Sequence, residues 1–431
     1  MFKEWFGAIK VYGDRRMVQI FWLGFASALP LPLTMGTLSL WMAESGVNKA
    51  TIGAFALVGL PYTLKFLWSP LMDVLAIPIV TRLLGRRRSW ILLTQILLCV
   101  AFVGLGSTNP SIDPVQTAVW ALMVSFFSAS QDIVIDAFRV EILDKNSYGA
   151  GAATSVFGYR IGLLVSGAGA LYMASLGSWF TVYCVMAALM SIGMITVLFC
   201  QEPKQSDSIS LNEKANQSRL KTAVIEPFVD FMSHKNWLLI LLFIICYKLG
   251  DAFLANMMNP FFVDIGFSKI EIANISKVFG LVTTLIGGFL GGLAISRYGI
   301  MKGLLYCGLL QMVSNLVFIA QAWAGHNIYM LMLTIAAENI TGGMGTTAFV
   351  AYISSLCNQK YTATQYALLS SFSSTGRTLL SSGSGVLVGI IGWSSFFMLT
   401  SFIAGIGIII LLYLMHRIKL SQSLSEFSST I

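Results

Sequence analysis

The sequence has few of the residues that build metal centres, disulfide frameworks or acid–base active sites. It contains three histidines and six cysteines in 431 residues, and no two cysteines form a CxxC pair. The histidines lie in loops or near the end of the chain, so no set of His and Cys has the spacing of a metal site. A P-loop and a nucleophile elbow are also missing. We therefore expect neither a membrane-embedded enzyme nor a protein with a metal or organic cofactor.

Charged residues are also scarce. They make up 11% of the chain, against about 25% in an average soluble domain, whereas 56% of the residues are hydrophobic. A surface with so little charge must face hydrocarbon, so the lipid bilayer is the expected partner. The net charge of +8 lies mostly in loops. It therefore does not indicate nucleic-acid binding.

Polar hairpins and Gly/Pro positions divide the chain into twelve apolar segments. Each has about 20 to 28 residues, which is enough for a helix to cross ~30 Å of hydrocarbon. The predicted fold is all-α, a polytopic membrane protein with twelve transmembrane helices. The segments are 17–40, 51–76, 89–107, 116–138, 150–174, 178–200, 236–262, 270–296, 302–322, 328–356, 363–390 and 393–415.

Lys and Arg residues predict the orientation in the membrane. Twenty of them fall in the arms and hairpins of one side, and only Lys49 and Lys269 fall in hairpins of the other side. Because positive loops stay in the cytoplasm, both termini are predicted to be cytoplasmic.

One long polar stretch divides the chain into two sets of six segments. The predicted parts are a cytoplasmic arm (1–16), a first six-helix half (17–200), a linker (201–235), a second six-helix half (236–416) and a cytoplasmic tail (417–431). Two six-helix halves joined by a central linker are typical of the major facilitator superfamily. We expect a monomer with the transport pathway between the halves.

The two halves resemble each other in sequence. Arg160 is followed by LLVSGAG (163–169), and Arg377 is followed by LLSSGSG (379–385). Each run leads into a Gly- and Trp-containing turn and a last span. This similarity indicates a duplication.

Acidic residues within the spans are candidates for proton coupling. Asp132 and Asp136 are four residues apart, so a helix places both on one face, and Glu338 lies near the middle of another span. A carboxylate in a spanning helix costs at least ~2.5–3.5 kcal/mol. Asp132 and Glu338 have no obvious partner nearby in sequence, so either one could carry a coupling proton. Asp136 is three residues from Arg139 near a helix end, where a local ion pair of structural or gating character is favoured.

Basic and amide side chains in the spans predict an anionic cargo. Arg160 and Arg377 can bind carboxylates through two hydrogen bonds each. Lys248 and Asp251 are three residues apart, so they form either a local ion pair or cargo contacts. The candidate cargo-binding residues are Lys65, Gln131, Arg160, Lys248, Asp251, Asn339 and Arg377.

An acid and a basic cluster flank one inner hairpin. Asp73 ends the segment WSPLMD, and Arg86, Arg87 and Arg88 follow in GRRRSW. This arrangement is similar to the loop motif of the major facilitator superfamily, in which such a pair closes the inner gate. The alternative is that the arginines only anchor the loop on the positive side.

Four stretches together resemble one family. They are LGFASALPLPLTMGTLSLWMAESGV (23–47), the WSPLMD and GRRRSW pair, SASQDIVIDAFRVEIL (128–143) and ENITGGMGTTAFVAYISSLCN (338–358). They are similar to the AmpG-type muropeptide permeases of Gram-negative bacteria. Gln131 and Asp132 match the family's QD motif, and Glu338 and Asn339 match its EN motif.

The resemblance implies an inner-membrane importer driven by the proton motive force, with the proton as coupling ion. Its cargo would be a sugar-peptide, N-acetylglucosamine–1,6-anhydro-N-acetylmuramic acid with or without the stem peptide, taken from periplasm to cytoplasm for cell-wall recycling. The related acetyl-coenzyme A transporters share the WSP and QD features. An exchanger of that or another anionic solute is therefore the alternative.

Overall fold

The structure is a computed structural model that describes residues 11–203 and 225–429. Within these ranges the chain is helical and contains no strand, which confirms the all-α class. Parts of three predicted regions lie outside the described residues. They are residues 1–10 of the N-terminal arm, 204–224 of the linker and 430–431 of the tail.

The chain forms two compact units. The N-terminal unit contains Lys10–Phe228 together with Ser354–Ser371, and the C-terminal unit contains Val229–Ile353 and Phe372–Ile431. The short stretch Ser354–Ser371 therefore packs with the N-terminal unit although it follows much of the second half in sequence. The division at the linker into two halves of six spans stays a prediction.

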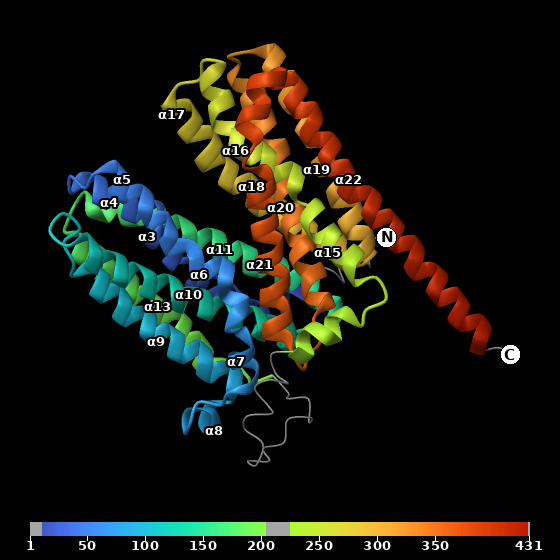
Figure 1. The fold of residues 1–431 in the computed structure, drawn as a ribbon, viewed down its shortest axis with the longest axis horizontal. Helices are drawn as coiled ribbons and strands as arrows, with labels where there is room; N and C mark the ends of the chain where they lie inside the picture. The colour runs from blue at the N-terminus through green and yellow to red at the C-terminus, as the bar shows by residue number, and fades with distance from the viewer. Residues whose placement is uncertain (1–10, 204–224, 430–431) are drawn as a thin grey trace. The chain divides into compact units, whose positions relative to one another are not determined.

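The N-terminal unit contains the following helices (Figure 1). They are α2 (Arg15–Ala28), α3 (Pro30–Thr34), α4 (Gly36–Glu44), α5 (Lys49–Ala54), η2 (Phe55–Gly59), α6 (Leu60–Leu64), η3 (Lys65–Leu67), α7 (Ser69–Val74), α8 (Val80–Leu84), α9 (Arg86–Gly106), α10 (Pro114–Ile142), α11 (Tyr148–Leu164), the π-helical turn η5 (Val165–Gly169), α12 (Ala170–Ala174) and α13 (Trp179–Phe199).

The C-terminal unit is built in the same way (Figure 1). It contains α15 (Trp237–Cys246), α16 (Leu249–Asp264), α17 (Lys269–Ile272), the π-helical stretch η6 (Ala273–Phe279), α18 (Gly280–Tyr298), α19 (Ile300–Ala324), α20 (Ile328–Leu356) and α22 (Ser384–Ser429). The helix α21 (Thr362–Ser381) begins in the N-terminal unit and ends in the C-terminal unit.

Several predicted segments are interrupted in the structure. The segment 51–76 consists of short pieces, and Pro61 and Pro70 stand in the first turns of α6 and α7. Proline lacks the N–H of a helical hydrogen bond, so a new helical turn begins there. The segment 363–390 is also broken, because α21 ends at Ser381 and α22 begins at Ser384. The helix α22 is itself kinked at Gly392, whose φ is 73°.

Nine helical stretches in the described chain are long and apolar enough to cross a membrane. A further apolar stretch, Thr51–Leu67, is shorter. The helices α20 and α21 also lie where spans were predicted. Their polar and Gly-rich faces carry several of the candidate site residues.

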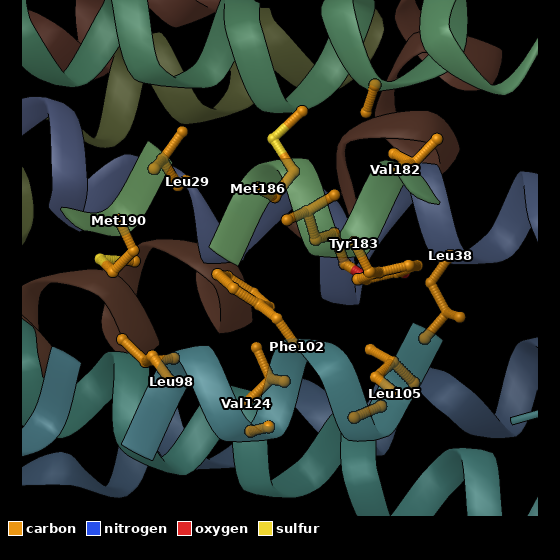
Figure 2. Close-up of a cluster of buried hydrophobic side chains, with 14 of the residues drawn as sticks. Leu29, Leu38, Leu98, Phe102, Leu105, Val124, Val182, Tyr183, Met186 and Met190 are labelled. Carbon is orange, nitrogen blue, oxygen red and sulfur yellow. The ribbon is translucent and has the colours of Figure 1, made fainter. Parts of the chain in front are cut away.

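Close helix contacts hold the N-terminal unit together. A Cβ atom on Gly158 or Gly162 of α11 would overlap the carbonyl oxygens of Phe21 and Phe25 on α2. Only glycine therefore allows these two backbones to touch. In the same unit, Phe102 of α9 packs with Tyr183 and Met186 of α13 in an apolar cluster (Figure 2).

Turn glycines repeat between the two units. Gly46 and Gly266 have φ values of 78° and 94° in the turns before α5 and α17. Gly85 and Gly299 have φ values of 89° and 79°, and each is the N-cap residue of a long helix, α9 or α19. Glycine takes this left-handed backbone without steric cost. The repeat seen around the two arginines in sequence thus extends to the turns.

Candidate functional site

Asp132 lies in the polar interior of the N-terminal unit. It stands on α10, is half-buried, and accepts a hydrogen bond of 2.5 Å from the hydroxyl of Ser27 on α2. Lys65, in η3, is buried and lies close enough for an electrostatic interaction with this carboxylate. The helix also contributes Gln131, one position earlier. Asp132 is therefore held by a hydroxyl and a nearby cation, with no ion pair among the described residues.

Gln131 is one of the buried amides of the structure, like Gln95 and Asn315, whose polar atoms have no hydrogen-bond partner among the described residues. Its side chain is fully buried, yet neither its amide oxygen nor its amide nitrogen has a hydrogen-bond partner among the described residues. A buried amide without partners costs about 1–3 kcal/mol. Such a group is suited to bind a polar ligand or water.

Arg160 on α11 and Arg377 on α21 share one property. Both guanidinium groups are partly buried, and in the described part of the chain neither forms an ion pair. The Nε of Arg377 donates to the carbonyl oxygen of Ser373 in its own helix at 3.2 Å. Among the described residues no carboxylate is in contact with either guanidinium, although Arg377 interacts electrostatically with Asp251.

Lys248 and Asp251 form an ion pair in the C-terminal unit. The pair stands at the break between α15 and α16, where Lys248 is the N-cap residue. The Lys248 Nζ lies 2.8 Å from Asp251 Oδ2. Gln311 of α19 binds both partners, because its Oε1 accepts from Lys248 Nζ at 3.3 Å and its Nε2 donates to Asp251 Oδ2. The local ion pair is thus present, and it has a third member that the sequence did not indicate.

Glu338 and Asn339 of α20 point to different neighbours. The carboxylate of Glu338 accepts from the hydroxyl of Ser314 on α19 at 3.2 Å. Asn339 accepts from Thr284 of α18 at 2.8 Å and donates to the carbonyl of Ile335 at 2.9 Å. Asn339 therefore forms one hydrogen bond to α18 and one within α20, whereas Glu338 has a single hydroxyl donor among the described residues.

Asp73 lies in a buried charged cluster. Its Oδ1 lies 2.6 Å from Arg87 Nη2, and the same nitrogen lies 2.6 Å from Glu141 Oε1. Arg87 is 1% exposed and Asp73 is 2% exposed. Removing one partner from a buried pair typically costs about 3–5 kcal/mol, so this triad is a strong local constraint.

The neighbouring arginines have other roles. Arg86 donates to the backbone carbonyl of Asp73. Arg88 donates to the carbonyl oxygens of Val197 and Leu198 at the end of α13, at 3.0 and 2.8 Å. Glu202 accepts the backbone N–H groups of Arg87 and Arg88 at the start of α9. Burial raises the pKa of Glu202, and these two N–H groups act in the opposite direction.

Asp73 also caps the first turn of α21. It accepts the backbone N–H groups of Ala363 and Thr364 at 3.2 and 2.8 Å, and the hydroxyl of Thr364 at 2.7 Å. A carboxylate at a helix N-terminus is favoured by the free N–H groups and the helix dipole. Asp73 thus joins the inner hairpin before α9 to the helix that follows α20.

A second contact reaches the same helix. Arg139 Nη2 lies 3.1 Å from Asp136 Oδ1 and donates to the hydroxyl of Tyr366 at 2.9 Å. The guanidinium carbon also lies 5.3 Å from the centre of the Tyr366 ring. The predicted Asp136–Arg139 pair therefore forms, and its cation is shared with α21.

Sequence reasoning missed several members of these sets. Glu141 and Gln311 contact partners 54 and 60 residues away, and Tyr366 contacts a partner 227 residues away. No local spacing could indicate such contacts.

The arrangement can do two kinds of chemistry. Asp132 and Glu338 are partly buried carboxylates with few donors, so each can gain or lose a proton without breaking an ion pair. Arg160 and Arg377 can bind an anion through parallel N–H groups. Asp73, with Arg87, can hold or release a helix end.

The chain is similar to known permeases over almost all of its length. It is 40% identical over 424 residues to the anhydromuropeptide permease of Escherichia coli strain K12. The aligned region covers 98% of this chain and 84% of the relative. It is 39% identical over 415 residues to putative transporter AmpG 4 of Rickettsia conorii, covering 95% of this chain and 99% of the relative.

Family models and solved structures agree with these matches. The model for acetyl-coenzyme A transporter 1 matches residues 17–197, and the Major Facilitator Superfamily model matches residues 240–428. The fold is similar to that of the E. coli fucose:proton symporter, with a TM-score of 0.68, 13% identity, and coverage of 92% of this chain and 98% of that one. It is also similar to the human organic anion transporter MFSD10, with a TM-score of 0.67, 14% identity, and coverage of 92% and 99%.

The relatives are permeases, and the apolar helices are those of a multi-pass membrane protein. The chain is therefore a transporter and not an enzyme. It belongs to the AmpG-type anhydromuropeptide permeases of the major facilitator superfamily.

Proposed function

We propose that this chain imports anhydromuropeptides from the periplasm to the cytoplasm by proton symport, as part of cell-wall recycling. It would lie in the inner membrane with both termini in the cytoplasm and work by alternating access. Two pairs of residues support the proposal. Arg160 and Arg377 form no ion pair in the part of the chain that the structure describes, and the carboxylates of Asp132 and Glu338 each accept from one hydroxyl there. An anionic sugar-peptide needs cations to bind it, and uphill import needs an acid that titrates.

The proposed roles follow from these environments. Arg160 and Arg377 bind anionic groups of the cargo, and the unpartnered amide of Gln131 binds a polar group such as a sugar hydroxyl. Lys65 stabilises the charged form of Asp132. Asn339 accepts from Thr284 of α18 and donates to a carbonyl of its own helix, so we assign it to helix packing and not to cargo contact.

Asp73 is proposed to hold the inner gate. It binds Arg87 and caps α21 at the same time, so opening the gate must break both contacts together. Arg139 adds a second hold on α21 through Tyr366. We therefore assign the closing of the inner gate to the contacts of Asp73 with Arg87 and α21 and of Arg139 with Tyr366.

Uptake into proteoliposomes tests the proposal. Purified protein is reconstituted, and labelled N-acetylglucosamine–anhydro-N-acetylmuramyl tripeptide is added with and without an inwardly directed proton gradient. We expect accumulation above the external concentration only with the gradient. Equal uptake in both conditions would contradict proton coupling.

The alternative cargo is another anionic solute such as acetyl-coenzyme A. The match of residues 17–197 to the acetyl-coenzyme A transporter model favours it. Competition separates the two cargoes. If coenzyme A thioesters displace the labelled muropeptide at lower concentration than unlabelled muropeptide does, the alternative is correct.

A further inference from the structure

The helix α19 brings two polar side chains into the charged interior of the C-terminal unit. Gln311 and Ser314 are one helical turn apart, and both are 3% exposed. Gln311 binds Lys248 through its oxygen and Asp251 through its nitrogen. An amide both donates and accepts, so it can serve a cation and an anion at once. No ionisable side chain of comparable length could serve both without adding a charge.

Two glycines of α20 leave space for the Gln311 amide. A Cβ atom on Gly345 would overlap Gln311 Oε1 and would lie 3.3 Å from Lys248 Nζ. One turn earlier, a Cβ atom on Gly342 would lie 3.7 Å from Gln311 Nε2 and 3.9 Å from Glu338 Oε1. The amide and the Glu338 carboxylate therefore approach the same point on α20. The two glycines provide the space in which they meet.

Ser314 extends the connection to Glu338. Its hydroxyl donates to Glu338 Oε2 at 3.2 Å and accepts from Thr341 at 2.9 Å. The charged groups facing this cluster are Lys248 and Asp251 beside the α15–α16 break, Glu338 of α20, and Arg377 of α21, which interacts electrostatically with Asp251. Two positive and two negative groups thus share one polar interior.

We propose that Gln311 is a positioning residue for proton coupling, which keeps Lys248 and Asp251 paired with each other so that, within this cluster, Glu338 is the group that takes up a proton. This inference rests on the proposed symport. The proton adds to the Glu338 carboxylate on the periplasmic side and leaves it on the cytoplasmic side. Lys248 and Gln311 both donate to Asp251, so the ion pair stays apart from the Glu338 carboxylate.

Replacing Gln311 tests this role. In Gln311→Leu, Asp251 loses one donor, so its negative charge is less well neutralised and acts more strongly on Glu338. A hydrogen bond to a charged group is worth about 1.5–3 kcal/mol. The midpoint of the uptake pH profile is therefore expected to move up by about one pH unit, a tenfold change in proton concentration.

The matched control is Gln321→Leu on the same helix. Gln321 is also fully buried and makes two hydrogen bonds, to the carbonyl of Gly325 and with the hydroxyl of Thr334. A merely structural effect of removing a buried amide from α19 would be the same in both variants. We expect the control to keep the wild-type midpoint, even if its stability falls.

A second variant leaves Gln311 in place. Gly345→Ala displaces the amide from its position, so its midpoint should shift in the same direction as that of Gln311→Leu. Its control is Gly405→Ala on α22, where the added methyl would lie 3.5 Å from Met312 Sδ in ordinary contact. This pair keeps the test decisive if Gln311→Leu does not fold.

The experiment measures muropeptide uptake into proteoliposomes from pH 5 to 8, with gradient-free counterflow measured in parallel. An upward shift of the midpoint in Gln311→Leu and Gly345→Ala, with both controls unchanged, supports the inference. If wild-type uptake depends on the gradient but these variants keep its midpoint, the inference is wrong while the proposed function stands. If the wild type takes up muropeptide without any gradient dependence, both fail.

Discussion

At the scale of the residue, the account depends on how each buried charge is held. Lys248, Asp251 and Arg87 are bound by opposite charges within 3 Å. Asp132 is bound by one hydroxyl, with Lys65 further off. Charges of the first kind are neutralised by a partner in contact, whereas the Asp132 carboxylate is in contact with a hydroxyl. This difference distinguishes charges that stabilise the fold from the acid proposed to carry a proton.

Asp132→Asn should abolish gradient-driven uptake. Asparagine has the same shape and keeps a contact with Ser27, but it cannot carry a proton. Accumulation is expected to fall by about tenfold or more, equivalent to ~1.4 kcal/mol, with counterflow retained. The measurement is uptake with and without a proton gradient.

The control for this variant is Asp113→Asn at the other end of α10. Asp113 is exposed and accepts the backbone N–H of Gln116 as the N-cap residue, a role asparagine also fills. Full gradient-driven accumulation by Asp132→Asn would show that this residue does not carry the proton and leave Glu338 as the candidate.

Arg160→Gln and Arg377→Gln should weaken cargo binding. Each removes a guanidinium that lacks an ion-pair partner among the described residues. Because a charge-assisted hydrogen bond is worth about 1.5–3 kcal/mol, the KM for muropeptide should rise by roughly ten- to a hundredfold. Arg82→Gln, at an exposed position in the short helix α8 before α9, serves as control. An unchanged KM in both variants would exclude these arginines from cargo binding.

At the scale of the element, two helices of equal length carry the candidate acids at different distances from their first residue. α10 and α20 each have 29 residues. Asp132 lies eighteen residues after Pro114, whereas Glu338 lies ten residues after Ile328. At 1.5 Å per residue the difference is roughly 12 Å. The two acids are therefore not equivalent positions of the repeat, and they need not share a role.

Removing Arg87 should destabilise the hairpin between α7 and α9. Arg87→Ala leaves Asp73 and Glu141 buried together without their cation, which costs about 3–5 kcal/mol. We expect a lower Tm in detergent and a more accessible inner side. Thermal unfolding followed by fluorescence measures the first effect.

Arg88→Ala is the matched comparison for Arg87→Ala. Arg88 adjoins Arg87 in the chain, but its guanidinium contacts only backbone carbonyls at the end of α13. Its loss should change Tm much less. Equal losses in the two variants would mean that the triad has no special weight.

Local sequence patterns predicted those features that depend on short spacing. The pairs Lys248–Asp251 and Asp136–Arg139 are one turn apart, so helix geometry alone brings them together. The break of α15 and α16 at Lys248 was not expected from hydropathy. Hydropathy averages over a window and is insensitive to a lost backbone hydrogen bond.

Contacts across the fold could not be predicted in this way. Nothing near Asp73 in sequence indicates that it caps α21, 290 residues away. Gln311 lies within an apolar span, and its partners are chosen by the packing of α16 and α20 against α19. Such contacts follow from tertiary structure, which hydrophobic periodicity alone does not specify.

At the scale of the whole molecule, each unit contains the same kinds of parts. Each has turn glycines of left-handed backbone, an arginine without an ion-pair partner among the described residues, and one acid held by a hydroxyl. The N-terminal unit adds the Asp73 cluster, with Ser354–Ser371 packed on it. The duplication thus supplied the framework, and each unit gained features of its own.

The most direct test of the central claim is the movement of protons with the cargo. Proteoliposomes with a pH-sensitive dye in the external medium, and no initial gradient, receive muropeptide from outside. The account predicts that the medium becomes more alkaline as the cargo enters, and that Asp132→Asn or Glu338→Gln removes this signal. Cargo entry without any alkalinisation in the wild type would contradict it.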